Sequence, residues 1–125
     1  MAKQFEFLKA EQRSPEWFAL RKEGITATEA AVIAGLSPYK TPYQLWAEKS
    51  GKYEPAPVGA AAMRGILLES TVADFYEIET RRKLKRSNGI VRIKEIPWAM
   101  ASLDRTVVGE NGLVEIKTSA SPRWS

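Results

Sequence analysis

The pattern of the chain changes at Asn88-Gly89, and this change constrains the fold more than any other feature. Before it, apolar residues recur at helical spacing between capping residues, whereas after it they alternate as in strands. Helices followed by strands are typical of an α/β protein of the α+β type. We therefore predict a helical part at 14–82 and a β-meander or mixed sheet at 88–118, in one domain of 125 residues.

The expected helices are marked by local signals at their ends. Ser14-Pro15-Glu16 predicts one helix start, and Thr26 followed three residues later by Glu29 is the capping-box pattern of a second. Thr41-Pro42 predicts a third start, and a longer fourth helix is expected from about residue 58 to 82. The apolar side of this fourth helix is expected to contain Met63, Leu67, Val72 and Phe75.

Strands are expected after the change of pattern. The stretch 90–93 alternates like a strand, and 100–103 has the composition of a second. The sequence Gly109-Glu110-Asn111-Gly112 lies between the apolar stretches 107–108 and 113–116, which is a hairpin signal.

The composition excludes several classes of chemistry. The chain has no cysteine and no histidine, which excludes disulfides, zinc sites with Cys or His ligands, and Ser-His or Cys-His nucleophiles. Hydrolysis would therefore depend on carboxylates, Lys, hydroxyl groups and a hard metal ion such as Mg²⁺. A net charge of +4 is compatible with a polyanionic partner. Because neither a signal peptide nor an apolar stretch of membrane length is visible, we expect a soluble cytoplasmic protein without a membrane partner.

The segment Glu115-Ile116-Lys117 combines an acid and a base two residues apart. On a strand these two side chains project to one face, and a hairpin of this length can bring Asp104 beside Glu115. Converging carboxylates repel unless a cation lies between them, and Lys117 could orient a water or stabilise developing negative charge. Chance alone supplies about one such triplet in a chain of this composition. The alternative is a solvent-facing Glu/Lys pair on a sheet.

Four blocks in a fixed order extend this pattern over residues 14–118. Together they resemble the phage-type alkaline exonucleases, the lambda exonuclease and YqaJ-like viral recombinase family. The blocks are Ser14 to Arg21 with Gly24 to Ala31, Gly35 to Pro42 with Leu45-Trp46 and Lys49-Ser50-Gly51, Arg64 to Glu69, and Ala101 to Asp104 with Gly112 to Lys117.

The resemblance implies a restriction-endonuclease-like PD-(D/E)XK nuclease core. The catalytic residues would be Glu69, Asp104, Glu115 and Lys117. Asp104, Glu115 and the carbonyl of Ile116 would bind Mg²⁺, or Mn²⁺ in its place, and Glu69 would bind it directly or through a water. The terminal phosphate of DNA would be held by Arg21, Thr28 and Ser102. The alternatives are a solvated helix residue for Arg21 and ordinary small polar residues for Thr28 and Ser102.

The family's activity would be digestion of one strand of double-stranded DNA from a 5′ end during phage recombination. Such enzymes form homo-oligomeric rings, often trimers, and act with a single-strand annealing protein. Two alternatives stay open: an endonuclease on the same core, and a non-catalytic DNA-binding or protein-interaction module. Leu103 stands where the family often has Pro, and this difference changes only the conformational preference of the backbone there. Residues 119–125 are expected to form a loop leading to a helix and strands of the family domain that are missing here.

A run of basic residues covers 81–94 without any acidic residue. Such runs are usually solvated, but in a nuclease this one could contact the DNA backbone, and the binding would then depend on salt. The run contains Arg81, Arg82, Lys83, Lys85, Arg86, Arg92 and Lys94.

Overall fold

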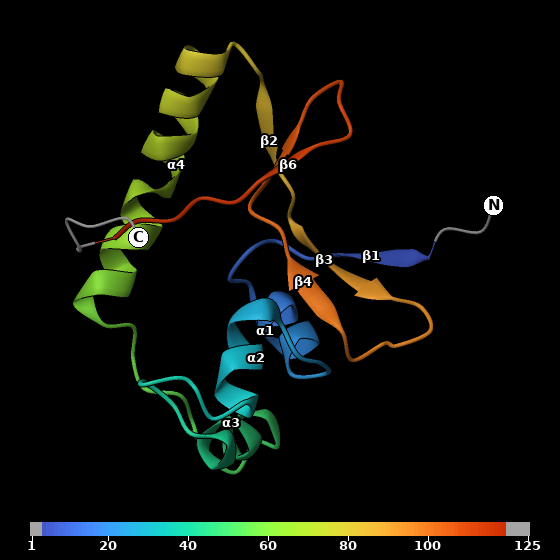
Figure 1. Ribbon diagram of the computed structural model, residues 1–125, viewed down its shortest axis with the longest axis vertical. Coiled ribbons are helices and arrows are strands. Elements are labelled where there is room, and N and C mark those ends of the chain that lie inside the picture. The colour runs from blue at the N-terminus through green and yellow to red at the C-terminus, as the bar shows by residue number, and fades with distance from the viewer. Residues whose placement is uncertain (1–3, 120–125) are drawn as a thin grey trace. The chain divides into compact units, whose positions relative to one another are not determined.

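The computed structural model describes residues 4–119, and Figure 1 labels its helices and all of its strands except β5. Its contacts group these residues into two compact units, each made of two separate stretches of chain. The first unit contains 4–55 and 88–103, and the second contains 56–87 and 104–119. This grouping differs from the expected helical part at 14–82 and sheet at 88–118, because each unit combines helices with strands. The loop expected at 119–125 falls, from residue 120 on, outside the described range.

The first unit contains an antiparallel sheet with the strand order β1-β3-β4. Strands β3 (Gly89–Ile93) and β4 (Met100–Ser102) confirm the two strands expected from alternation. Strand β1 (Phe5–Lys9) was not expected, and it pairs with β3 so that Leu8 lies opposite Ile90. The first strand after the change of pattern therefore pairs with the beginning of the chain.

Three short helices of the first unit begin where the capping signals place them. Helix α1 (Pro15–Arg21) has its Trp17 amide donating to the Ser14 hydroxyl over 3.2 Å. Helices α2 (Ala27–Ile33) and α3 (Pro42–Lys49) each begin with a capping box. In each helix, side chains satisfy amide groups that the first turn would leave without partners.

The core of the first unit lies between α1 and the sheet. It consists of Ala10, Trp17, Ile90 and Met100, with Leu20 packed against it. Ile90 has no exposed surface. Beside it, the backbone of Gly89 passes so close to β1 that a Cβ atom there would lie 2.2 Å from the Phe7 ring. An alanine here would require the exposed Phe7 ring to turn and the Leu8 carbonyl, 2.9 Å from the new Cβ, to shift.

The second unit contains helix α4 (Ala60–Thr80) and an antiparallel sheet with the order β2-β5-β6. The strands are β2 (Leu84–Arg86), β5 (Arg105–Val107) and β6 (Leu113–Val114). The hairpin expected around 109–112 is confirmed, because β5 pairs with β6. The turn is closed by a bond of 3.0 Å from the Val107 amide to the Gly112 carbonyl, and Gly109 has a φ of 81°.

Strand β6 is shorter than expected and ends at Val114. Beyond it, the Ile116 amide donates to the Asp104 carboxylate over 2.8 Å. A side chain therefore replaces the backbone acceptor that a longer β-ladder would provide, and Glu115 to Lys117 follow the strand instead of lying in it.

Helix α4 buries a different side from the one expected. Its buried residues are Glu69 and Ala73. The residues expected to form the buried apolar side are exposed, at 43%, 68%, 36% and 62% for Met63, Leu67, Val72 and Phe75. The expectation was wrong because an ion pair buries the Glu69 side, which apolar periodicity cannot reveal. None of the described helices, α4 included, is both long and apolar enough to cross a membrane.

Candidate active site

A hollow of about 300 Å³ in the second unit collects the acidic residues that the sequence singles out. Helix α4 supplies Glu69, the residue before β5 is Asp104, and the segment after β6 supplies Glu115 to Lys117. The remaining lining residues are small or apolar: Ala61, Ala62, Gly65, Ile66 and Thr118. The structure thus brings Glu69, Asp104, Glu115, Ile116 and Lys117 to one place, although 46 residues separate Glu69 from Glu115.

Asp104 is the most perturbed acid of the hollow. Burial raises the pKa of its carboxyl above the ordinary value, and the nearby charges of Glu115 and Glu69 raise it further. The hydrogen bond from the Ile116 amide and the charge of Lys117 act in the opposite direction and are outweighed. Because burial is the largest cause, the Asp104 carboxyl is costly to ionise, and a bound cation would favour its ionised form.

Glu115 and Lys117 project to the same side, as strand-like alternation predicts. Lys117 Nζ lies 3.2 Å from Glu115 Oε1, and both side chains are about half exposed. Ile116, between them, is partly buried and donates its amide to Asp104. The ammonium group is therefore at the mouth of the hollow, next to one of the acids.

Glu69 is paired with a residue that sequence reasoning missed. Arg105 Nη1 lies 2.7 Å from Glu69 Oε1, and both residues are buried. A signal for this contact is present in the sequence, because Arg105 alternates with Val107 on the buried face of β5. A charged residue on the buried face of a strand indicates a buried partner of opposite charge.

The oxygen donors of the hollow suit a hard divalent cation, since carboxylates and backbone carbonyls are the ligands that Mg²⁺ prefers. Among residues 4–119, however, no three acidic side chains lie close enough together to form a ready-made metal site. The Arg105 contact explains part of this arrangement, because one oxygen of Glu69 already has a cationic partner. Metal binding therefore stays a prediction, supported by the oxygen donors that line the hollow.

Arg21, expected to hold a phosphate, belongs to a polar network in the first unit. Its guanidinium donates to the Thr26 hydroxyl over 3.2 Å and lies 4.6 Å from the centre of the Trp17 ring. Thr26 donates to Glu29, which is also paired with Lys49 Nζ at 3.1 Å. The network fixes the orientation of the guanidinium and leaves it partly exposed. Thr26 is a member of this network that sequence reasoning treated only as a helix cap.

The other two expected phosphate ligands differ from Arg21. Thr28 is exposed in the first turn of α2, where amide groups and the helix dipole favour an anion. The Ser102 hydroxyl is buried and has no hydrogen-bond partner among the described residues. The role of all three in phosphate binding stays a prediction.

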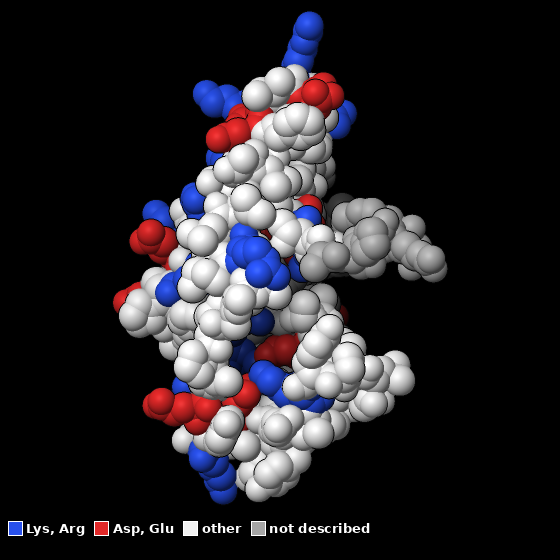
Figure 2. All heavy atoms as spheres, turned by 90° about the vertical axis from the view of Figure 1, so that its left-hand side faces the viewer, with Lys and Arg blue, Asp and Glu red and all other residues white. Residues whose placement is uncertain are grey.

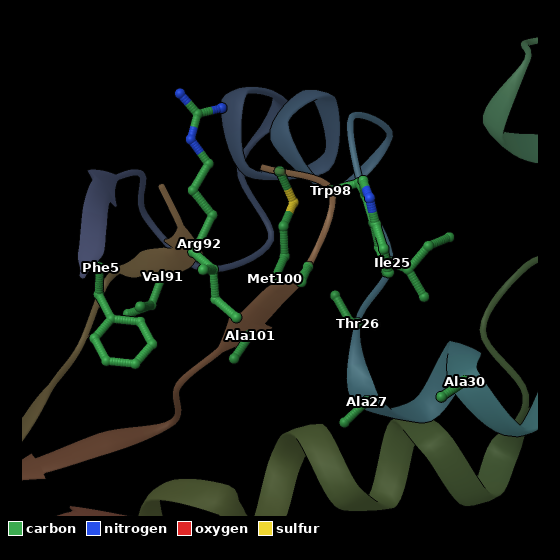
Figure 3. Close-up of a pocket in the computed structure, with 12 residues that line it drawn as sticks. Phe5, Ile25, Thr26, Ala27, Ala30, Val91, Arg92, Trp98, Met100 and Ala101 are labelled. Atoms are coloured by element: carbon green, nitrogen blue, oxygen red, sulfur yellow. The ribbon is translucent and has the colours of Figure 1, made fainter. Parts of the chain in front are cut away.

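The first unit also contains a hollow of about 350 Å³, shown in Figure 3. Its walls are apolar and include Ile25, Trp98 and Met100. Arg92 is its one charged lining residue, and its guanidinium is paired with Glu6 at 2.8 Å. Since this hollow has no carboxylate among its lining residues, it does not offer the acid–base or metal chemistry of the hollow in the second unit.

The basic run at 81–94 is partly neutralised by acidic residues from elsewhere in the chain. Arg82 lies 3.6 Å from Glu110, and Arg92 pairs with Glu6. Figure 2 shows acidic and basic side chains intermingled on the face it displays. The run is therefore not uniformly free to contact DNA.

Comparison with known proteins identifies the family. The family model of the YqaJ-like viral recombinase domain matches residues 16–125 of the sequence. The chain belongs to this family. The proteins to which it is similar include the uncharacterized protein YqaJ of Bacillus subtilis (strain 168), 36% identical over 113 residues, which are 90% of the chain and 35% of that protein. Protein D345L of African swine fever virus (strain Badajoz 1971 Vero-adapted) is 34% identical over 68 residues, 54% of the chain and 20% of that protein.

A solved structure supports the expected fold. The crystal structure of LHK-Exo in complex with dAMP matches with a TM-score of 0.63 and 30% identity, over 82% of the chain and 52% of that protein. The expected family and fold class are thereby confirmed. The chain spans about a third of YqaJ and about half of LHK-Exo.

Proposed function

We propose that this chain contains the metal-binding centre of a deoxyribonuclease that hydrolyses phosphodiester bonds of DNA with Mg²⁺. One observation supports the proposal above the others: Glu69, Asp104, Glu115, Ile116 and Lys117, which come from three separate segments of the chain, line one hollow. Membership of the YqaJ-like family and the likeness to a solved exonuclease agree with it.

The residues have distinct roles in this proposal. Asp104 and Glu115, with the Ile116 carbonyl, would hold the divalent cation, which supplies Lewis acidity and a more acidic bound water. Glu69 would complete the acidic set from α4. Lys117, which is exposed and paired with Glu115, would orient a water or stabilise negative charge developing on the phosphate.

The finer proposal is a 5′-to-3′ exonuclease of double-stranded DNA in the cytoplasm of a bacterial or phage-infected cell. It depends on Arg21, whose guanidinium is fixed and partly exposed and has the planar donor geometry that suits phosphate. A homo-oligomeric ring and a single-strand annealing partner belong to the same proposal. The direct test compares linear duplexes with 5′-phosphate and 5′-hydroxyl ends: Arg21→Ala should remove the preference for phosphate.

The test of catalysis uses Lys117→Ala in the intact protein, with linear duplex DNA and Mg²⁺. We expect a loss of at least about 100-fold in rate, the usual effect of removing a group that acts in proton transfer or charge stabilisation. Lys9→Ala is the matched control, because Lys9 is exposed on β1. Undiminished digestion by Lys117→Ala would contradict the proposed mechanism.

A second candidate is a non-catalytic DNA-binding module, favoured by the lack of a ready-made acidic cluster among the described residues. The two candidates differ in their response to metal. A carboxylate site should gain thermal stability with Mg²⁺ or Mn²⁺, because a ligand bound only by the folded state stabilises it. No gain, combined with salt-sensitive binding of DNA, would favour the binding module. Digestion of closed circular DNA would instead indicate an endonuclease.

A further inference from the structure

Arg105 is a buried cation directly beside the proposed metal ligands. Only 4% of its surface is exposed, and its Nη1 donates to Glu69 Oε1 over 2.7 Å. Removing a guanidinium from water is costly, and a protein in which two apolar residues replace a buried ion pair is often as stable or more stable. The burial of this charge is therefore not explained by packing alone, which directs attention to what its hydrogen bonds hold.

The same nitrogen forms a second hydrogen bond, to the backbone carbonyl of Asp104 over 3.0 Å. The Asp104 carboxylate in turn accepts the Ile116 amide. The Arg105 guanidinium thus connects the Glu69 carboxylate with the backbone of Asp104. Through the Asp104 carboxylate it is connected with Ile116, in the segment after β6. Each of the residues connected in this way lines the hollow, whereas Arg105 itself does not.

We propose that Arg105 is a positioning residue for the metal centre: it sets the orientation of the Glu69 carboxylate relative to Asp104, and thereby the affinity for the divalent cation. This inference rests on the proposed function. A planar guanidinium can hold a carboxylate and a carbonyl in fixed directions, whereas the ammonium of lysine is a point charge on a flexible stem. Residues that orient metal ligands typically change metal affinity or activity by about 10- to 100-fold when replaced.

The rival explanation is that Arg105 only joins α4 to the sheet. In that case its replacement would lower stability without changing how the folded protein binds metal. Metal affinity measured on folded protein therefore separates the two explanations, and it needs neither DNA nor catalysis.

The experiment compares the intact wild-type protein with Arg105→Lys, which keeps the charge. Mn²⁺ binding is measured by calorimetry on protein shown to be folded by circular dichroism. We expect the Kd for Mn²⁺ to rise by about 10- to 100-fold. In nuclease assays, kcat at a fixed metal concentration should fall while KM for DNA is unchanged, and excess metal should restore part of the rate. Arg82→Lys is the matched control for metal affinity, because Arg82 forms an exposed ion pair with Glu110 in the same unit.

Two results would overturn the inference. One is an Arg105→Lys protein that binds Mn²⁺ within about twofold of the wild type. The other needs no variant and therefore does not depend on its folding: a Mn²⁺-bound wild-type structure in which Arg105 has left Glu69. If the wild type itself binds no divalent cation, the proposed function fails and the inference with it. A wild type that binds metal, with an unaffected variant, refutes the role of Arg105 alone.

Discussion

The buried pair of Arg105 and Glu69 allows a thermodynamic prediction that is independent of activity. Glu69→Leu would leave the guanidinium buried beside an apolar side chain, and Arg105→Met would leave the carboxylate without its cation. In either single variant the remaining charge keeps its desolvation penalty and loses the attraction of this ion pair. The double variant Glu69→Leu/Arg105→Met removes both charges and fills the space with side chains of similar volume.

The burial of the two residues determines the expected magnitude. With 4% of Arg105 and 8% of Glu69 exposed, solvent screens the pair little. Each single substitution should cost about 3–5 kcal/mol of unfolding free energy, whereas replacement of a buried pair by apolar residues is often nearly neutral. The double variant should therefore be more stable than either single variant, by at least about 2 kcal/mol.

The assay is urea denaturation followed by circular dichroism, in EDTA so that metal binding does not contribute. The exposed pair of Arg82 and Glu110, whose side chains are 51% and 55% exposed, is the control and should show no measurable coupling. Additive costs at Arg105 and Glu69, with the double variant the least stable protein, would refute the argument from burial.

Two further predictions concern Asp104 and Gly89. Because burial raises the folded-state pKa of Asp104, its contribution to stability is present below the ordinary value of 3.8 and is lost as the pH rises through the raised value. In metal-free buffer the melting temperature of Asp104→Asn should therefore increasingly exceed that of the wild type as the pH rises from about 3.5 to 7, and a constant difference would contradict this. Gly89→Ala should cost about 1–3 kcal/mol, measured by urea denaturation, because the new Cβ would lie 2.2 Å from the Phe7 ring and 2.9 Å from the Leu8 carbonyl. Unchanged stability would mean that β1 moves aside without strain.

Features determined by a few neighbouring residues were predictable from the sequence. The starts of α1, α2 and α3 follow from capping residues that act within one turn, at Ser14, Thr26 and Thr41. The β5–β6 hairpin follows from a turn that needs a positive φ, which Gly109 supplies.

Features that depend on distant partners were not predictable in this way. Strand β1 alternates, but its pairing with β3 joins residues 80 to 88 positions apart, and local sequence contains no information about that register. The same holds for α4, whose buried side includes Glu69, the partner of the distant Arg105. Apolar periodicity predicted the helix correctly but not which of its sides is buried.

The candidate site was predictable in its members and not in its connections. The triplet 115–117 alone was near chance expectation, and the order of the four blocks supplied the missing specificity. The Arg105–Glu69 contact was not predicted, because a single Arg after Asp104 has many possible partners in the sequence. The network around Arg21 escaped for a similar reason, since Thr26 satisfies both a helix cap and a guanidinium.

The turn between β5 and β6 has a consequence for how this chain can vary in length. Pairing places Arg105 opposite Val114 and Thr106 opposite Leu113. This register between the two strands determines that the Ile116 amide is the one that reaches the Asp104 carboxylate. Extra residues at the tip, between Gly109 and Gly112, would leave this alignment intact. One residue added within either strand would exchange inward and outward side chains and direct Glu115 and Lys117 away from Asp104. Natural insertions and deletions should therefore be confined to the tip, and an inserted tag would be tolerated there.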